Sequence, residues 1–364
     1  AKWFGAEDVS IVPGSERRWP QSHSAAVNVK YEGGENSQVL FLKKVFARSM
    51  QEKPLPALRK DLSSNRVEAR FYRDFAPVLE SRGVPLLTAL KMEENLDEAL
   101  ADPDDECRVR SGGLILLLPS APGYQISPLN SEQARSTLQW LARFHAAAWE
   151  DAALLGRAAE QLHEVGGTWA LRHRGTADLR KMTEVWPKFL EGFDRLAPEL
   201  LAKPEIRQLA ARLELVATRL GEELSVGPAT AFATLLHGDF KAANIFLPEG
   251  EEGSGPIAID FQWVGLGFGM ADVSMHLIHS VAPEALQDGG DEQLVQAYLS
   301  ELRRFLPAPK AEAYTDAVAW HHYRMGVLDY ARNLFVGFVT DPASAKAKNE
   351  HPRAINIGMV YRDT

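Results

Sequence analysis

Three polar residues in the second half of the chain have the types and the spacing that metal-assisted phosphoryl transfer requires. Asp239 and Asn244 lie five positions apart between two apolar runs, and Asp260 ends a later apolar segment, residues 257–259. In phosphoryl transfer from a Mg-nucleotide, one carboxylate orients the acceptor hydroxyl, while an amide and a second carboxylate hold the metal ions. The set therefore predicts a kinase.

A lysine near the end of an early apolar strand is the next candidate. Residues 39–45 predict a β-strand, and successive side chains of a strand point to opposite faces. Lys43 and Lys44 therefore lie on opposite faces of that strand, and only one of them can reach phosphates from the buried face. The residues leave open whether Lys43 or Lys44 does so, and most lysines at strand ends are simply solvated.

Glu68 is the candidate partner of that lysine. It borders the apolar stripe of a helix that we predict over residues 66–75, with its N-cap at residues 63–65. Pairing with the strand lysine would fix the lysine for contact with phosphate. The alternative is a surface network with the arginines of the same helix, and the local sequence by itself favours this network.

The order of elements predicts an α+β chain of two lobes. Strands are expected over residues 8–46, 85–92 and 114–118, followed by a connector over residues 119–128. Beyond the connector the pattern is mainly helical. We therefore expect a nucleotide-binding N-terminal lobe, residues 1–119, and a catalytic and substrate-binding helical lobe, residues 120–364.

Further segments are expected within the two lobes. Residues 32–36 predict a turn, and the acidic stretch 93–106 predicts a loop or a short exposed helix. A helix is expected over residues 133–149, and three or four helices over residues 150–225, where Pro187 is one of several breakers. The remaining expectations are short strands at 232–236, 245–247 and 257–259, a longest helix at 317–335, and an irregular tail from Asp341 onward.

Composition limits the class of protein. The chain has 364 residues, 45% of them hydrophobic and 24% charged, which is typical of a globular protein of two lobes. A formal net charge of -9 argues against a nucleic-acid binder, because such proteins neutralise phosphates with basic residues.

Cysteine usage and hydropathy give an expected location. Cys107 is the single cysteine, so no intrachain disulfide forms and a reducing, cytoplasmic compartment fits. No apolar run approaches the roughly 20 residues of a membrane span. The first residue is Ala1, which leaves a removed organelle-targeting peptide open. The sequence carries no signal of oligomeric state.

Four stretches of the chain carry a family resemblance: residues 40–43, 68–72, 141–149 and 237–262. They resemble the aminoglycoside phosphotransferase and choline kinase superfamily, and most closely its ecdysteroid-kinase-like branch. The resemblance implies a bilobal protein-kinase-like fold, with a small β-rich N-lobe and a larger, mainly helical C-lobe. It also implies ATP and Mg2+ as cofactors.

The resemblance assigns roles to matching residues. It implies Asp239 as the catalytic base, Asn244 and Asp260 as Mg2+ ligands, Lys43 as the contact to the α- and β-phosphates, and Glu68 as the residue that positions Lys43.

The resemblance also suggests roles for three residues in or near the loop that carries Asp239. Lys241 matches a lysine that faces the transferring phosphate in protein kinases, and a solvated lysine is the equal alternative. His237 is expected to brace the loop, and Asp272 resembles the family's buried helix aspartate that supports it.

The chain departs from the family pattern at the phosphate cover. No Gly-x-Gly-x-x-Gly follows Val12, so Ser15, Ser22, His23, Ser24 or backbone groups must take its place. The strand that leads to the connector ends in Leu-Pro-Ser, where the relatives often carry an acidic pair. Adenine recognition is therefore left open.

The acceptor is expected to be the hydroxyl of a small molecule. A protein kinase is disfavoured because Gly238 replaces the catalytic-loop arginine, Gln262 replaces the glycine of Asp-Phe-Gly, and no Ala-Pro-Glu follows. A nucleotide-binding pseudokinase or regulatory scaffold is the alternative from another class. A cationic acceptor such as choline needs an acidic or aromatic cage, and the candidates for one are mixed in type: Trp263, His276, Tyr323, Asp329 and Tyr330. A sterol-like or other apolar alcohol is also compatible with the sequence.

Overall fold

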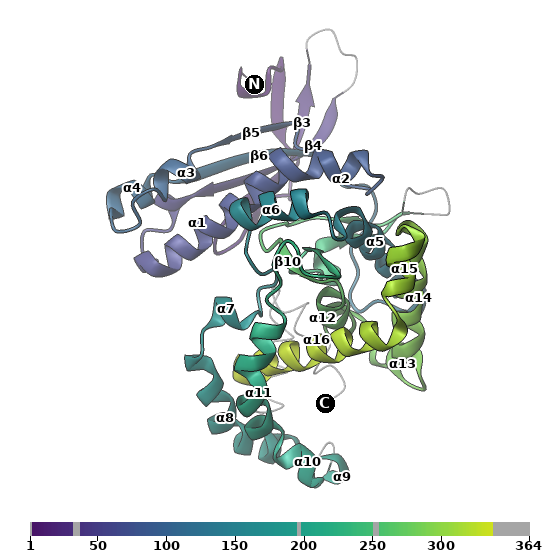
Figure 1. Cartoon of the computed structure of the whole chain (residues 1–364). Coiled ribbons are helices and arrows are strands. Elements are labelled where there is room, and N and C mark those ends of the chain that lie inside the picture. Colours follow the sequence, from purple (N-terminus) through teal and green to yellow (C-terminus); the bar gives the residue numbers. More distant parts are fainter. Residues whose placement is uncertain (1, 32–36, 195–197, 250–254, 338–364) are drawn as a thin grey trace. The chain divides into compact units, whose positions relative to one another are not determined.

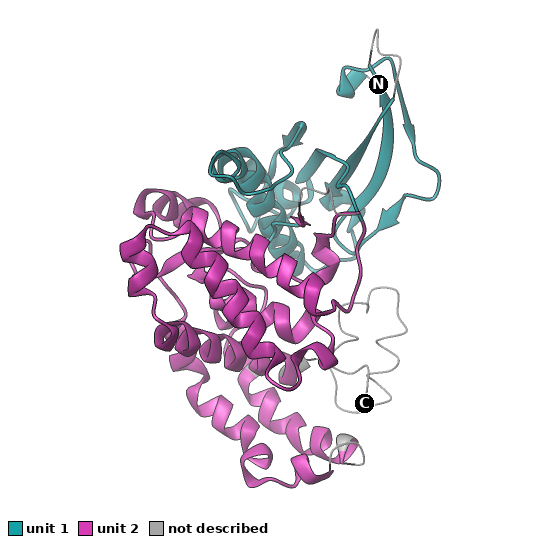
Figure 2. Ribbon diagram, turned by 90° about the vertical axis from the view of Figure 1, so that its right-hand side faces the viewer, with its two compact units in different colours: residues 1–123, 259–262 teal, residues 124–258, 263–364 magenta. Residues whose placement is uncertain are grey.

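The chain divides into two compact units in the computed structural model (Figure 2). The structure describes residues 2–31, 37–194, 198–249 and 255–337. Unit 1 contains residues 1–123 and 259–262, and unit 2 contains residues 124–258 and 263–364. The short return segment 259–262 places Asp260 in unit 1, although it lies far along the chain. Our division into functional lobes, 1–119 and 120–364, stays a prediction.

Unit 1 is built on an antiparallel sheet (Figure 1). The strand order is β1-β3-β4-β6-β5, and β2 pairs with β3. The bounds are β1 Asp8–Ile11, β2 Arg17–Arg18, β3 His23–Lys30, β4 Gln38–Phe46, β5 Lys91–Glu94 and β6 Gly113–Pro119.

The two faces of this sheet differ in what they carry. Val27, Leu40 and Leu42 lie on one face, in a cluster of buried apolar side chains. Lys43 belongs to the other face, because side chains alternate along β4. One face therefore carries this apolar cluster, and the other carries the buried Lys43 in the same row as the buried Leu116.

Two predicted elements of unit 1 have different bounds in the structure. Helix α1, Leu55–Arg70, begins after Pro54, so residues 63–65 lie inside the helix and are not its N-cap. Pro54 and the proline in the first turn of α1 fix the start of the helix. Proline is tolerated in the first turn, but the residue before a proline is disfavoured in the helical conformation, so the helix does not extend further back. Of the strand predicted over 85–92, only Lys91 and Met92 belong to β5, which runs on to Glu94, so the strand begins and ends later than predicted.

The other helices of unit 1 are short. A π-helical turn, Phe71–Phe75, and α2, Ala76–Ser81, continue α1. The 3-10 turns Lys2–Phe4 and Ala47–Ser49 and the helices α3, Leu96–Ala99, and α4, Glu106–Arg110, complete the unit. The acidic stretch 93–106, for which a loop or a short exposed helix is the expectation, contains the end of β5 and the short helix α3.

Unit 2 is mainly helical. Its helices are α5 Ser131–Ala148, α6 Ala152–Gln161, α7 Leu171–Arg174, α8 Ala177–Phe193, α9 Pro198–Leu201, α10 Pro204–Arg207, α11 Leu209–Glu223, α12 Met270–Ser280, α13 Pro283–Leu286, α14 Gly290–Phe305, α15 Ala308–Ala313 and α16 Asp316–Gly337. Two antiparallel pairs of strands lie among them: β7 Ala233–Leu236 with β10 Gly265–Phe268, and β8 Ile245–Phe246 with β9 Ile257–Ala258.

Helix α5 forms as its sequence predicts. The Asn130 side chain accepts a hydrogen bond from the Gln133 N–H, and the Gln133 side chain accepts one from the Asn130 N–H, which makes a capping box. Leu138, Leu141 and Phe144 are buried on one stripe of the helix. Because α5 packs on α14 and β7, it forms part of the scaffold around the loop that follows β7.

The region 150–225 holds more helices than predicted. The described part contains six helical segments, α6 to α11, and Pro187 lies inside α8. A proline within a helix costs about 3 kcal/mol. Burial of Met182 and Trp186 against Leu213 of α11 stabilises α8 at this point, so tertiary packing outweighs the local propensity.

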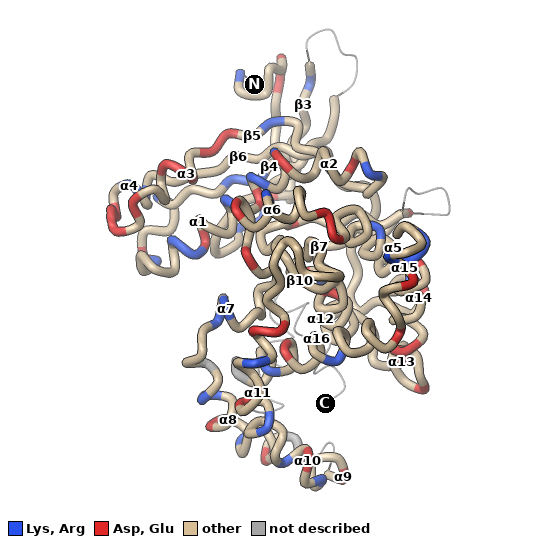
Figure 3. Tube along the Cα trace, in the orientation of Figure 1, with Lys and Arg blue, Asp and Glu red and all other residues tan. Residues whose placement is uncertain are grey.

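The predicted α+β class is confirmed: the first unit is rich in strands, and the larger second unit is mainly helical. The predicted turn at 32–36 and the tail from Asp341 lie outside the described residues. Basic and acidic residues are interspersed along the trace of both units (Figure 3). Among the helices that the structure describes, none combines the length and the apolar character needed to cross a membrane.

Candidate active site

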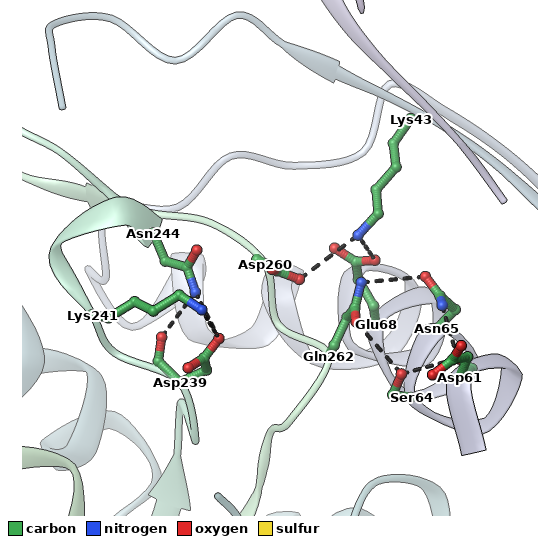
Figure 4. A network of polar contacts seen from close by, with 10 residues as sticks. All are labelled: Lys43, Asp61, Ser64, Asn65, Glu68, Asp239, Lys241, Asn244, Asp260 and Gln262. Carbon is green, nitrogen blue, oxygen red and sulfur yellow. Dashed lines mark hydrogen bonds and ion pairs between the residues drawn. The ribbon is translucent and has the colours of Figure 1, made fainter. Parts of the chain in front are cut away.

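The buried lysine of unit 1 is paired with a carboxylate (Figure 4). The Lys43 Nζ donates a hydrogen bond to Glu68 Oε2 at 2.7 Å and lies 3.7 Å from Asp260 Oδ1. Lys43 is 8% exposed and Glu68 is 2% exposed. Lys44 is exposed on the opposite face, so of the two lysines only Lys43 meets this cluster.

Electrostatics keep Lys43 charged. Burial alone lowers the pKa of a lysine, but the nearby carboxylates of Glu68 and Asp260 raise the pKa of Lys43 above its ordinary value of 10.5. The unit therefore holds a fixed cation next to two carboxylates, an arrangement that suits contact with phosphate.

The surface network that local sequence favours for Glu68 is not what the structure shows. The helix arginines pair with other carboxylates: Arg66 and Arg70 with Asp97, and Arg73 with Glu94. Glu68 points inward instead. The register of α1 against β4 decides this, and helical periodicity alone placed Glu68 at the border between the two faces.

Gln262 is a residue that the sequence reasoning assigned only as a missing glycine. Its amide group lies between two residues of α1: Nε2 donates to Asn65 Oδ1 at 3.3 Å, and Oε1 accepts from Ser64 Oγ at 3.4 Å. Phe261 stacks on Phe71 with ring centroids 4.0 Å apart. These contacts hold the segment that carries Asp260 against the helix that carries Glu68. No local pattern in the sequence indicates them.

Asp260 has an unusual backbone and an unsatisfied oxygen. Its φ of 67° lies in the left-handed region, which costs energy for a residue with a side chain. Its Oδ1 is buried and receives no hydrogen bond from the part of the chain that the structure describes. The Lys43 ammonium, 3.7 Å away, gives this oxygen an ion-pair partner but no hydrogen bond, and a carboxylate oxygen without a hydrogen bond suits a cation as ligand.

The loop after β7 brings the other predicted residues together. The Asn244 Nδ2 donates to the Asp239 backbone oxygen at 2.9 Å and to Asp239 Oδ2 at 3.1 Å. The Lys241 Nζ lies 2.8 Å from the same Asp239 oxygen. Asp239 is 9% exposed and Asn244 is 6% exposed. Because Nδ2 of Asn244 is committed to Asp239, the amide oxygen is the atom that remains for a ligand (Figure 4).

A buried carboxylate on α12 holds the start of this loop. Asp272 accepts hydrogen bonds from the backbone N–H groups of His237, at 2.7 Å, and Gly238, at 3.0 Å. The His145 Nε2 donates to Asp272 as well, and the His145 Nδ1 accepts from the Tyr298 hydroxyl at 2.8 Å. All of these side chains are fully buried. The chain thus fixes the loop through a polar network that has no access to solvent.

Gly238 is required by close packing of backbone. Its φ is 79°, and a Cβ atom there would lie 2.0 Å from the Trp263 carbonyl oxygen and 2.7 Å from the Gly167 nitrogen. Thr168 N also donates to the Gly238 carbonyl. Residue 238 therefore cannot carry the arginine that stands here in protein kinases, for a steric reason as well as a functional one.

His276 supports the loop from behind. Its Nδ1 donates to the Phe240 carbonyl at 2.9 Å, and its Nε2 lies 2.8 Å from the Thr137 hydroxyl. Burial lowers the pKa of His276 to about 4, so the ring is neutral near neutral pH. The histidine acts as a fixed hydrogen-bond donor to the residue that follows Asp239.

The residues considered for a cation cage have separate partners. Asp329 pairs with Arg332 at 2.7 Å in the interior. Trp263 stacks on His163, and the Tyr330 hydroxyl contacts His279. His276 is committed to the loop, and Tyr323 packs edge-on against Trp320. Each contact fits a structural role better than ligand binding.

The donor set fits a magnesium ion better than a transition metal. Within the described residues, no three His, Cys, Asp or Glu side chains gather as a metal cluster. Magnesium does not need such a cluster, because it is commonly held by one or two protein oxygens together with phosphates and water. Each unit by itself offers an oxygen of that kind: the Asn244 amide oxygen in unit 2, and the Asp260 Oδ1 in unit 1.

Comparison with known families gives a match over half of the chain. The model of the ecdysteroid kinase-like family matches residues 123–309, which include Asp239, Asn244 and Asp260. No curated protein sequence matches the chain.

Comparison with solved structures gives several distant kinases. An ethanolamine kinase of Plasmodium vivax has 11% identity and a TM-score of 0.45, covering 98% of this chain and 81% of its own. A choline kinase of Cryptosporidium parvum has 9% identity and a TM-score of 0.44, covering 98% and 87%. An aminoglycoside-3'-phosphotransferase of type VIII has 14% identity and a TM-score of 0.40, covering 88% and 93%. At identities and TM-scores this low, no substrate passes from these proteins to this chain.

The backbone contact at Gly238 predicts a severe effect of a single methyl group. We expect Gly238→Ala to lower the free energy of unfolding by about 3 kcal/mol or more, because Cβ would overlap the Trp263 carbonyl and favour a different φ. Urea unfolding measures this. The control is Gly156→Ala in α6, where nothing lies within 4 Å, and it should stabilise by about 0.5–1 kcal/mol. Equal stability of the two variants would contradict the packing described.

The buried neutral His276 predicts an acid-sensitive stability. Its pKa is about 4 in the folded chain against 6.5 for a free histidine, so the unfolded chain binds more protons between these values. Stability is therefore complete above pH 6.5 and falls as the pH decreases towards 4, by roughly 2–3 kcal/mol from this group. Urea unfolding at several pH values should show a shallower pH dependence for His276→Gln than for the wild type. Parallel curves would remove His276 as the cause.

Proposed function

Because the chain belongs to the ecdysteroid kinase-like family, we propose that it is an ATP- and Mg2+-dependent phosphotransferase that moves the γ-phosphate to a hydroxyl of a small molecule. The observation that carries this proposal is the buried, charged Lys43, held by Glu68 and next to Asp260. A buried ion pair without a task is a weak source of stability, since desolvation offsets much of its Coulomb energy. Binding of a phosphate group would account for a charged lysine at this buried position.

The chain's own residues have separate parts in the proposed reaction. Asp239 orients the acceptor hydroxyl and accepts its proton, and Asn244 fixes the Asp239 carboxylate through Nδ2. Lys43 contacts the α- and β-phosphates, while Glu68 holds Lys43 in place. Lys241, which touches the Asp239 carboxylate, assists at the γ-phosphate.

The proposed magnesium site uses oxygens that have the right chemistry. Asn244 and Asp260 would hold the ion through the amide oxygen and Oδ1. When bound, Mg2+ neutralises the charge of the phosphates during transfer. The strained backbone of Asp260 is consistent with a functional position, because strain of this kind concentrates at active sites.

A small-molecule acceptor is supported by the loop itself. Gly238 leaves no arginine to pair with a phosphorylated activation segment, and its close contact with Trp263 excludes one. Regulation by phosphorylation of an activation segment, as in many protein kinases, needs that arginine. The candidates for binding a cation have partners within unit 2, such as Arg332 for Asp329 and His163 for Trp263, so the proposal extends to alcohols in general and not to choline-like cations alone.

The direct test is a screen for phosphorylated product. Purified protein with MgATP is offered amino alcohols, aminoglycosides, sterols and other apolar alcohols, and mass spectrometry detects the added phosphoryl group. We expect at least one acceptor to react. Asp239→Asn should lower kcat by about 100-fold or more, the usual contribution of a general base. Asp104→Asn, on a 94% exposed side chain of unit 1, is the matched control and should keep full activity.

A second measurement separates an active kinase from the pseudokinase alternative. At 100 times Kd, a ligand stabilises the folded state by about 2.7 kcal/mol, so MgATP should raise Tm. Asp260→Ala should abolish the Mg2+-dependent part of this shift. Stabilisation by MgATP with no phosphorylated product from the panel would favour a nucleotide-binding scaffold. If MgATP does not stabilise the protein and no phosphorylated product forms, the proposed function is refuted.

A further inference from the structure

A short hairpin occupies the part of unit 1 where a glycine-rich loop is missing. Strand β2, Arg17–Arg18, pairs with the start of β3, and the Trp19 N–H donates to the Ser22 carbonyl at 2.8 Å to close the turn. Before β2, the chain leaves the edge of β3 after Val12 and returns at Arg17. The hairpin therefore lies beside the start of β3, whose residues His23 and Ser24 pair on their other side with Lys44 and Lys43.

The register of three strands aligns Arg17 with Lys43. Arg17 lies opposite Ser24, and Ser24 lies opposite Lys43. Residues directly opposite each other in antiparallel strands project to the same face. Since neighbouring strands are roughly 4.8 Å apart, the Arg17 and Lys43 Cα atoms are about 10 Å apart on one face. Two long cationic side chains at this spacing can meet the same polyphosphate.

The neighbouring arginine has the opposite orientation. Arg18 lies opposite His23, and His23 lies opposite Lys44. This row belongs to the face that carries the Val27 and Leu42 core, and not to the face of Lys43. Arg17 and Arg18 are thus adjacent exposed arginines with the same charge and different faces.

The Arg17 side chain is anchored and still has donors to offer. Its Nη1 donates to the carbonyls of Gly14, at 2.8 Å, and Glu16, at 3.0 Å. Among the described residues no acceptor contacts its Nε or Nη2, and no carboxylate forms an ion pair with it. A guanidinium that is held at one nitrogen and open along its other edge is suited to bind a phosphate through two parallel hydrogen bonds.

Ser15, Ser24 and His23 are less suited to this contact than Arg17 is. The Ser15 hydroxyl donates to the Val12 carbonyl and accepts from the Ala26 N–H, so it holds the loop to β3. His23 lies in the row of Arg18 and Lys44. Ser24 is buried on the correct face, with a short side chain between the two cations.

We propose that Arg17 takes the place of the glycine-rich loop and binds the β- and γ-phosphates of the nucleoside triphosphate. This inference rests on the proposed use of ATP. A glycine-rich loop offers neutral backbone N–H groups to phosphate, whereas Arg17 offers a full charge and a bidentate edge. Lys43 on β4 and Arg17 on β2 then contact the phosphate chain from the same face of the sheet.

The test compares Arg17→Gln with Arg18→Gln in nucleotide binding. Isothermal titration with MgATP, MgADP and AMP gives the affinity as phosphates are removed. We expect Arg17→Gln to weaken MgATP binding about tenfold and to leave AMP binding unchanged, because charged hydrogen bonds to the outer phosphates are lost. Arg18→Gln should bind all three nucleotides as the wild type does. The ratio of the AMP and MgATP Kd values is the measure, since it does not depend on the fraction of active protein.

Each other outcome counts against the proposal. Equal weakening in both variants would indicate a general effect of surface charge. An unchanged ratio in Arg17→Gln, with or without a lower Tm, would leave Arg17 as a brace of the loop at Gly14 and Glu16 only. If the wild type binds none of the nucleotides, the proposed function fails together with this inference. Binding by the wild type with no effect of Arg17→Gln overturns the inference alone.

Discussion

The buried carboxylate of Asp272 is the interaction on which unit 2 depends. It accepts the N–H groups of His237 and Gly238, and His145 satisfies it from α5. An unpaired carboxylate in this position would be costly, so helix α12, helix α5 and the loop after β7 must assemble together. The positions of Asp239 and Asn244 follow from this assembly, because both lie within the next few residues of the chain.

Unit 1 is organised by a different polar centre with the same physical logic. Lys43 and Glu68 neutralise each other in the interior, and Gln262 ties the Asp260 segment to α1 through Ser64 and Asn65. The buried pair and the strained backbone of Asp260 both cost energy, and packing such as the Phe71–Phe261 stack offsets it. Residues with a proposed role in chemistry are therefore those that stability alone would not select.

Local sequence patterns predict some elements of this chain correctly and others incorrectly. Helix α5 follows from its apolar stripe and its Asn130 cap, and β4 follows from an apolar run with alternating faces. The start of α1 was misplaced because serines and asparagine at 63–65 suit a cap, whereas the structure uses them inside the helix to bind Gln262. Pro187 predicts a break in the helix, but packing on α11 keeps it within α8.

The sequence by itself determined the fold class and indicated Asp239, Asn244, Asp260 and a lysine at position 43 or 44 as candidates, because these depend on periodicity and short spacings. Only the tertiary structure decided that Glu68 turns inward, that Gln262 joins α1, that Gly238 has no room for a side chain, and that Arg17 shares a face with Lys43. These contacts join residues far apart in the chain or depend on strand register. A local pattern cannot specify either of them.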